Sequence, residues 1–150
     1  MALTLTSLDD YKAYKGITGS SDDALYTSIL EAVEKAFIDD SGRKIAQVAS
    51  ETFYPDGDGT DHIVLPRRPV TAVASVHEDI SAFRGQGTDP YPASTLLTSG
   101  THYWIDNLNE DEENPAILYR LNGVWPDRKG SVKVVLTHGY AATPSDIKLA

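Results

Sequence analysis

Residues 7–42 read SLDDYKAYKGITGSSDDALYTSILEAVEKAFIDDSG, and this stretch decides the fold because it carries two helix patterns in succession. In the first pattern, Ser7 precedes Asp10 by three residues, as in a capping box with Asp in place of the usual Glu or Gln. Apolar and aromatic residues follow at helical spacing: Leu8, Tyr11 and Tyr14. Gly16 and Gly19 then interrupt the pattern, which predicts one short helix before them.

A second, longer helix is predicted after these glycines. Ser20 and Ser21 are candidate N-caps, and Asp22 and Asp23 supply acids for the first turn. Large apolar residues repeat at every fourth position and form one continuous stripe: Leu25, Ile29, Val33 and Phe37. Gly42, followed by two basic residues, is typical of a helix end.

From about residue 48, short extended runs alternate with Gly, Pro, Asn and Asp. Residues 52–54 and 62–65 flank a Pro-Asp-Gly-Asp-Gly turn and are predicted to pair as a hairpin. The further predicted strands are 70–76, 103–105, 116–121 and 132–136. Strands at this spacing without helices between them favour an antiparallel sheet or a small sandwich. Residues 81–100 are predicted to form a long loop anchored by Leu96 and Leu97.

The predicted fold class is therefore α+β, with the N-terminal helical pair packed with the β-rich segment and a C-terminal helix start. That helix start is Thr-Pro-Ser-Asp at 143–146, with Pro in the first turn. A chain of 150 residues fits a single domain. We expect a helical part at 1–44, a β-rich part at 48–138 and a C-terminal docking segment at 143–150.

Composition excludes several classes of function. The net charge is −9, which disfavours a surface that grips nucleic-acid phosphates or anionic lipid. No apolar run approaches the roughly 20 residues that span a bilayer, and no export signal opens the chain, which favours the cytoplasm. Without cysteine, the chain cannot form a disulfide, a thiolate nucleophile or a zinc ribbon.

The most suggestive binding motif is the Asp-rich stretch 56–61, because alternating aspartates can wrap a hard cation. A calcium loop beginning at Asp56 needs Gly at its sixth position and Glu at its twelfth, where this chain has Asp61 and Arg67. Asp and Gly are also the residues that a tight turn needs. The turn interpretation is therefore favoured over a calcium site.

No catalytic constellation is predicted. The four histidines share no ligand spacing: His62, His77, His102 and His138. A G-x-S-x-G motif and a phosphate-cradling glycine motif are missing from the sequence. We expect no enzymatic activity, no cofactor and no metal site.

Taken in order, several segments resemble the bacteriophage head–tail connector family, also called adaptor or head completion proteins. The segments that carry the resemblance are the opening residues 3–17, the helix at 22–43, YPDGDG at 54–59, LPRRPV at 65–70, NGVWP at 122–126, and 132–148 with its Pro-Ser-Asp-Ile-Lys end. Each motif alone is common, and their order is what makes the resemblance specific.

This resemblance implies a structural virion protein that forms a homo-oligomeric ring, usually of twelve copies. Such a ring docks on the portal protein, extends the DNA channel and offers an attachment surface to the tail or a second connector protein. DNA passes through without specific binding, and no membrane is involved. Synthesis in the host bacterial cytoplasm and location at the head–tail interface of the virion follow from the same resemblance.

Two groups of residues are predicted to serve this role. The partner interface is assigned to Tyr140, Pro144, Ile147 and Leu149, with the helix start ordering on contact with the portal. An acidic loop or channel lining is assigned to Glu110, Asp111, Glu112 and Glu113. Family members usually continue in helix beyond the Pro-x-Asp segment, whereas this sequence stops at Ala150, so a portal-facing tail is missing or docking differs.

Two alternative functions remain open from the residues alone. One is a monomeric β-rich module that binds carbohydrate through Tyr103, Trp104 and Trp125. The other, ranked last, is a hydrolase assembled from dispersed acids and histidines.

Overall fold

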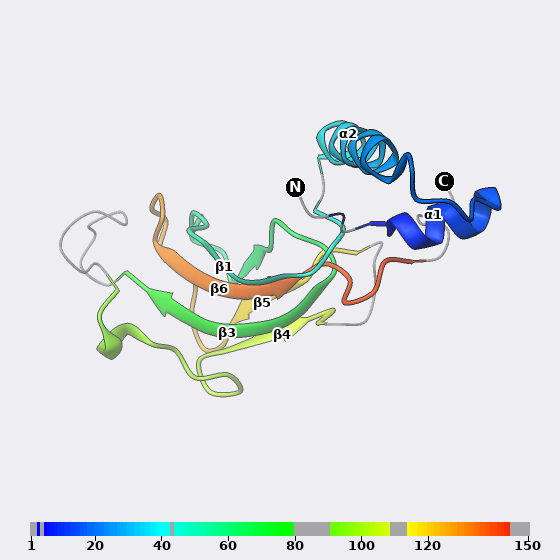
Figure 1. The fold of residues 1–150 in the computed structure, drawn as a ribbon. Helices are drawn as coiled ribbons and strands as arrows, with labels where there is room; N and C mark the ends of the chain where they lie inside the picture. The colour runs from blue at the N-terminus through cyan, green and yellow to red at the C-terminus, as the bar shows by residue number, and fades with distance from the viewer. Residues whose placement is uncertain (1–2, 4, 43, 80–90, 109–113, 145–150) are drawn as a thin grey trace. The chain divides into compact units, whose positions relative to one another are not determined.

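The computed structural model describes residues 3, 5–42, 44–79, 91–108 and 114–144. The chain divides into two compact units: Met1–Gln47 with Tyr140–Ala150, and Val48–Gly139. Both helices lie in the first unit, and the six strands of the described residues lie in the second (Figure 1). The predicted α+β class is confirmed, with a helical pair followed by antiparallel β-structure.

Helix α1 (Leu8–Lys15) begins and ends where its capping residues predict. The Asp10 N–H donates to Ser7 Oγ at 3.0 Å, which satisfies one of the free donors of the first turn. Gly16 ends the helix in the left-handed region, with φ at 67°.

Helix α2 (Asp23–Ser41) starts differently from the prediction. Asp22 is the N-cap in place of Ser20 or Ser21, and its side chain makes no capping hydrogen bond. The reason is a turn before the helix, in which the Asp23 N–H donates to the Ser20 carbonyl at 3.3 Å. The predicted end is confirmed, since Gly42 adopts φ 62° and donates to the Ile38 carbonyl.

The two helices contact each other near the loop between them. Lys12 Nζ lies 2.7 Å from Asp23 Oδ1, and the rings of Tyr11 and Tyr26 are 5.6 Å apart. Tyr140 adds a short parallel bridge to this unit: its backbone N–H donates to the Ile45 carbonyl at 2.9 Å.

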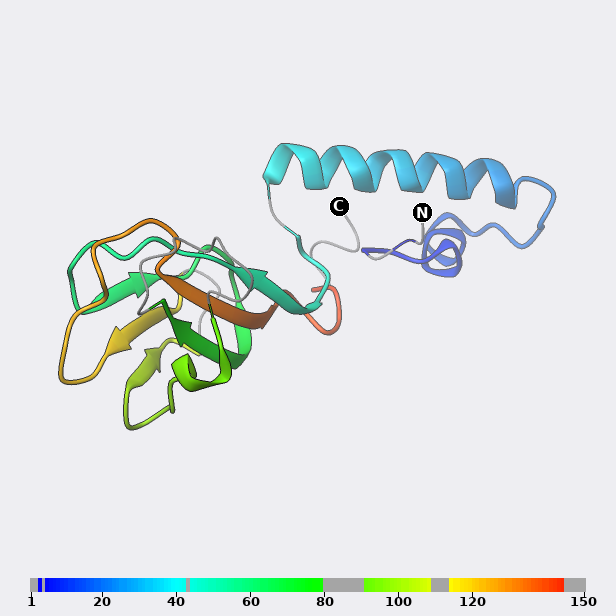
Figure 2. The same ribbon diagram turned by 90° about the vertical axis from the view of Figure 1, so that its left-hand side faces the viewer.

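The second unit contains two three-stranded sheets in which every pairing is antiparallel. The first sheet has the order β1 (Val48–Phe53), β6 (Val132–His138), β3 (Val70–Glu78). The second has the order β2 (His62–Val64), β5 (Ile117–Arg120), β4 (Tyr103–Asp106). Figure 2 shows the strands of both sheets from a second side.

The predicted hairpin is wrong. Residues 52–54 belong to β1 or follow it, yet β1 pairs with β6, whereas β2 pairs with β5 in the other sheet. Asp and Gly residues favour a turn between two strands, but they do not determine whether those two strands pair with each other. Here the connection 54–61 crosses between the sheets and bonds to a distant loop, with reciprocal Gly57–Arg128 backbone hydrogen bonds of 3.1 Å.

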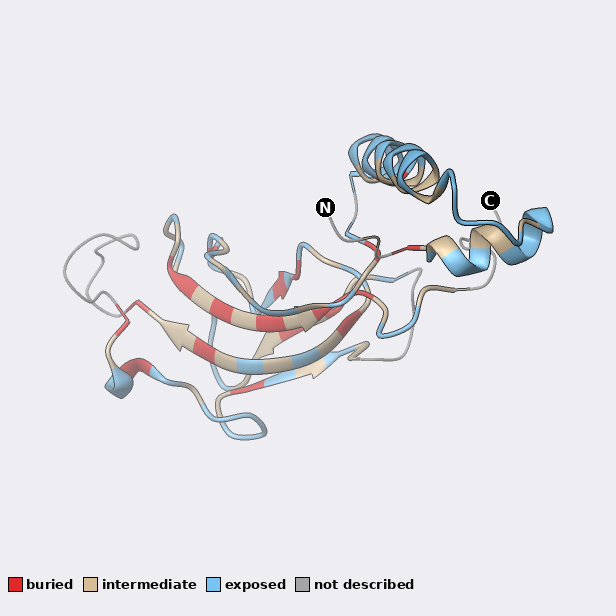
Figure 3. Cartoon of the chain, viewed as in Figure 1, coloured by how far each residue is buried: buried red, intermediate tan, exposed pale blue. Residues whose placement is uncertain are grey.

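Both sheets contribute to one hydrophobic core, so the fold is the small sandwich rather than a single sheet. Central strand β6 alternates as predicted, with Val132, Val134 and Leu136 fully buried and Lys133 between them less so (Figure 3). Leu118 of the second sheet is also fully buried in this core.

The predicted long loop is only partly described, because residues 80–90 lie outside the described ranges. Its later part contains a 3-10 turn, η1 (Ala93–Thr95). Leu97 packs against the core and donates its N–H to the Val76 carbonyl, as an anchor should. Leu96 is exposed, contrary to the prediction, because adjacent residues of an extended segment point to opposite sides.

A Gly57→Ala substitution is expected to destabilise the sandwich by about 3 kcal/mol. A methyl group at this position would lie 2.0 Å from the Pro126 carbonyl oxygen, which is backbone and can move only with its loop. Gly123→Ala is the matched control, since its methyl would meet only ordinary contact at 4.0 Å. Urea unfolding of the two variants measures the difference, and equal stabilities would contradict the tight loop packing.

Candidate functional site

Helix α2 has two different faces that carry apolar residues. The inward face is formed by residues four apart that are buried or half-buried: Tyr26, Leu30, Glu34 and Ile38. Glu34 is held there as it accepts the Leu5 N–H at 3.3 Å. The predicted apolar stripe lies one residue earlier in every turn, so it is rotated by about 100° from the inward face.

The α2 stripe, defined as Leu25, Ile29, Val33 and Phe37, is exposed. These residues are 58, 50, 60 and 40% accessible, along about 18 Å of helix. Figure 3 shows that much of α2 is in the exposed class. Apolar side chains gathered in one continuous row mark an interaction surface more strongly than scattered ones. The α2 stripe is therefore a candidate protein–protein interface.

The first unit has a small hydrophobic core. Among its described residues, only Leu5, Glu34 and Ile45 are buried. A unit with so few buried side chains gains much from covering the α2 stripe, because burial of apolar area is the main stabilising term in association.

The predicted partner interface is only partly described. Tyr140 and Pro144 are half-buried, and Tyr140 lines a shallow groove of the first unit with Leu5 and Gln47. Ile147, Leu149 and the predicted C-terminal helix start lie outside the described residues. All four residues of the predicted acidic group at 110–113 also lie outside the described residues.

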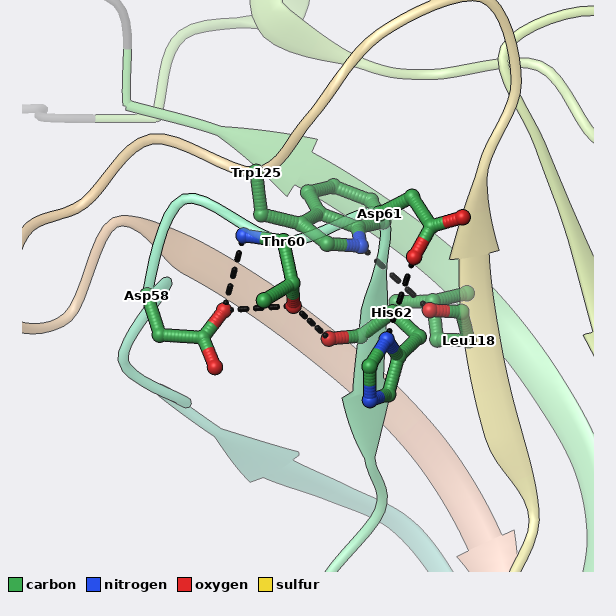
Figure 4. A network of polar contacts seen from close by, with 6 residues as sticks. All are labelled: Asp58, Thr60, Asp61, His62, Leu118 and Trp125. Carbon is green, nitrogen blue, oxygen red and sulfur yellow. Dashed lines mark hydrogen bonds and ion pairs between the residues drawn. The ribbon is translucent and has the colours of Figure 1, made fainter.

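The Asp-rich loop satisfies its carboxylates within the protein (Figure 4). Asp58 accepts the Thr60 hydroxyl at 2.6 Å and the Thr60 N–H at 3.0 Å, and these hydrogen bonds lower the pKa of Asp58. Asp61 faces the His62 ring at 3.1 Å, whereas Asp56 accepts the Gly130 N–H at 2.6 Å. The carboxylates thus serve three different contacts, which supports the turn interpretation.

The structure does not bring the histidines together. His138 is buried, with Nε2 2.5 Å from Glu51, whereas His77 contacts Thr95 and His102 accepts the Thr98 N–H. Across the described ranges, no group of three or more His, Asp or Glu side chains could hold a metal ion.

Two of the three residues proposed for carbohydrate binding are unsuitable. Trp125 is fully buried, with its indole N–H donating to the Leu118 carbonyl at 3.3 Å, and Tyr103 is also in the core. Burial raises the pKa of Tyr103. Trp104 alone is accessible, at 44%, because side chains alternate along β4 and Tyr103 takes the inward position.

Sequence reasoning missed the partners of Trp104. The indole stacks on Tyr119 of β5, with centroids 5.1 Å apart and planes inclined by 13°. On the other side, His62 of β2 lies 6.1 Å from Tyr119. The only available signal was alternation within each short strand, which does not identify the neighbouring strand.

Within the part of the chain that the structure describes, neither helix combines the length and apolar character that a bilayer crossing requires.

Comparison with known proteins finds a similar fold in a solved structure of a particle neck. No protein-family model and no curated protein matches the sequence. Among solved structures, the chain is similar to a chain of the neck of an empty GTA (gene transfer agent) particle computed with C6 symmetry. The match covers 95% of this chain and 70% of that chain, with a TM-score of 0.54 and 17% sequence identity. The two chains therefore share a fold.

Proposed function

We propose that this chain is a structural subunit of the neck of a phage-like particle, where it acts as a head–tail connector. The observation that carries this proposal is the fold similarity to a neck chain over 95% of the sequence. A match of that extent includes both the helical unit and the sandwich. The similarity is therefore not limited to one common structural motif.

The α2 stripe supports assembly into a ring. Neighbours in a closed ring meet through two different surfaces, so each subunit needs an interface that is uncovered when it is alone. A large apolar side chain contributes roughly 1.5–3 kcal/mol when it passes from full exposure to full burial. Covering four half-exposed side chains therefore gives several kcal/mol for each contact.

The finer features of the proposal come from the sequence resemblance. The ring contains twelve copies, docks on the portal protein, extends the DNA channel and receives the tail or a second connector protein. The six-fold symmetry of the similar neck is compatible with twelve copies, because twelve is a multiple of six. The net charge of −9 suits a wall along which DNA slides without being bound. The chain is made in the host cytoplasm, becomes part of the virion and performs no catalysis.

The test is deletion of the gene in the phage or host genome that encodes this chain, followed by electron microscopy of the particles. A head–tail connector is needed to join finished parts, so we expect DNA-filled heads and separate tails. Supplying the wild-type gene in trans should restore joined particles. Normal tailed particles from the deletion strain, at wild-type numbers, would refute a connector role.

A further inference from the structure

The outward face of the second sheet carries an unusual set of side chains. Strand register places His62, Tyr119 and Trp104 in one row across β2, β5 and β4. A second row contains Val64, Ile117 and Asp106. We call these six residues the aromatic face.

Alternation along the strands confirms that this face points away from the core. The neighbouring residues Ile63, Leu118 and Tyr103 are buried in the sandwich. By contrast, Val64 is 54% accessible, and His62, Trp104 and Asp106 are also exposed. The aromatic face therefore presents three adjacent rings and two aliphatic side chains at the surface.

Carboxylates lie at both edges of the aromatic face. Asp61 precedes His62 on the β2 edge, with Oδ1 3.1 Å from the imidazole Nδ1. Asp106 lies on the β4 edge, where it accepts the Asn107 N–H at 3.0 Å. None of the six residues is Lys or Arg.

The cation nearest in sequence is directed elsewhere. Arg120 follows Tyr119 on β5, but its guanidinium lies 5.7 Å from the ring centre of buried Trp125 and 3.1 Å from Glu78. The aromatic face thus combines stacked ring surfaces with carboxylates at its edges and contains no Lys or Arg.

We propose that the aromatic face is a docking site for an arginine-bearing segment of a second protein. A guanidinium is planar, stacks on Trp and Tyr rings and forms paired hydrogen bonds with a carboxylate. The stacked Trp104–Tyr119 pair supplies the ring surface, and Asp61 and Asp106 supply the opposite charge. Nucleic acid fits poorly, since its phosphates would meet these carboxylates.

This docking site is independent of ring formation. It lies in the sandwich, whereas the α2 stripe lies in the helical unit. Loss of one surface and loss of the other can therefore be distinguished experimentally.

The test measures binding of a fluorescent synthetic peptide in which Arg alternates with Leu, with the full-length chain as receptor. A peptide with citrulline at each Arg position is the matched uncharged probe. We expect saturable binding of the arginine peptide, and binding weaker by about tenfold or more for the citrulline peptide.

Variants locate the binding on the protein. Trp104→Ala is expected to weaken binding about tenfold, and Asp106→Asn several-fold. Tyr54→Ala is the control, because Tyr54 is an exposed aromatic residue outside the aromatic face, and it should leave binding unchanged.

Three results would overturn the proposal. They are the absence of saturable binding, equal binding of the citrulline peptide, and equal losses in all three variants. A glycan array distinguishes the carbohydrate alternative. If the chain binds a glycan but not the arginine peptide, and Trp104→Ala abolishes glycan binding, the aromatic face is a carbohydrate site instead.

Discussion

A Val33→Asp variant is expected to lose ring assembly while its free subunit remains folded. Val33 lies in the middle of the α2 stripe and is 60% accessible in the single chain. Its replacement in the free subunit should change the free energy of unfolding by no more than about 0.5 kcal/mol. In an assembled contact, the new carboxylate would be buried without a partner, at a cost of several kcal/mol. Each subunit contact should weaken by about 100-fold or more.

The control for this variant is Ser28→Asp, which adds the same charge to an exposed position of α2 outside the stripe. Native mass spectrometry and negative-stain microscopy of both variants, with the portal protein present, compare their assemblies. We expect rings from Ser28→Asp and from the wild type, and single subunits from Val33→Asp. Unchanged rings from Val33→Asp would show that the α2 stripe is not a subunit contact. If Val33→Asp instead unfolds the free chain, the stripe is covered within one subunit and the proposed contact is wrong.

The second large effect is expected at Trp125. Trp125→Ala should lower the free energy of unfolding of the sandwich by about 3–5 kcal/mol, since it empties the largest fully buried side chain of the core. The substitution also removes the indole donor that satisfies the Leu118 carbonyl. A domain of this size has only about 5–15 kcal/mol of stability, so the variant loses a large part of it.

Trp104→Ala is the matched comparison, because it removes the same side chain from the surface of the same sandwich. Its expected cost is about 1 kcal/mol, the value of one aromatic stack. Urea unfolding followed by circular dichroism measures both variants without depending on tryptophan fluorescence. Equal losses would contradict the assignment of one tryptophan to the core and the other to the surface.

Local features could be predicted from the sequence wherever the determining contact is short-range. Ser7 caps α1 through a residue three positions away, and Gly16 and Gly42 end their helices through their own backbone freedom. Alternation in β6 likewise places Val132, Val134 and Leu136 in the core. None of these predictions depends on a distant partner.

Features that depend on distant partners could not be predicted. The Asp-Gly turn at 54–61 has the residues of a hairpin, yet pairing of β1 with β6 joins strands more than 80 residues apart. The α2 stripe is visible in the sequence as an apolar row. The exposure of this row could not be predicted, because the adjacent row that contains Leu30 and Ile38 also carries apolar residues and could equally have been expected to face inward or outward.

The two tryptophans illustrate the same limit. Trp104 lies in a strand and Trp125 in a connection without regular structure, which makes the connection residue the more obvious surface candidate. The backbone N–H of Trp125 donates to the Thr60 carbonyl at 2.7 Å, and this contact with the crossing loop holds the residue where its side chain enters the core. Only the pairing of the strands reveals the aromatic face.

The most direct test of subunit assembly through the α2 stripe is thiol protection in purified particles. The chain has no cysteine, so Val33→Cys introduces a single reactive group. Lys35→Cys is the control, about 200° around the same helix from position 33 and highly accessible. In dilute free protein, both thiols should react rapidly with a maleimide. In assembled particles, we expect the thiol at 33 to be protected and the thiol at 35 to remain reactive. Equal reactivity at the two positions in the particle, or protection of position 33 already in the free chain, would contradict assembly through this helix.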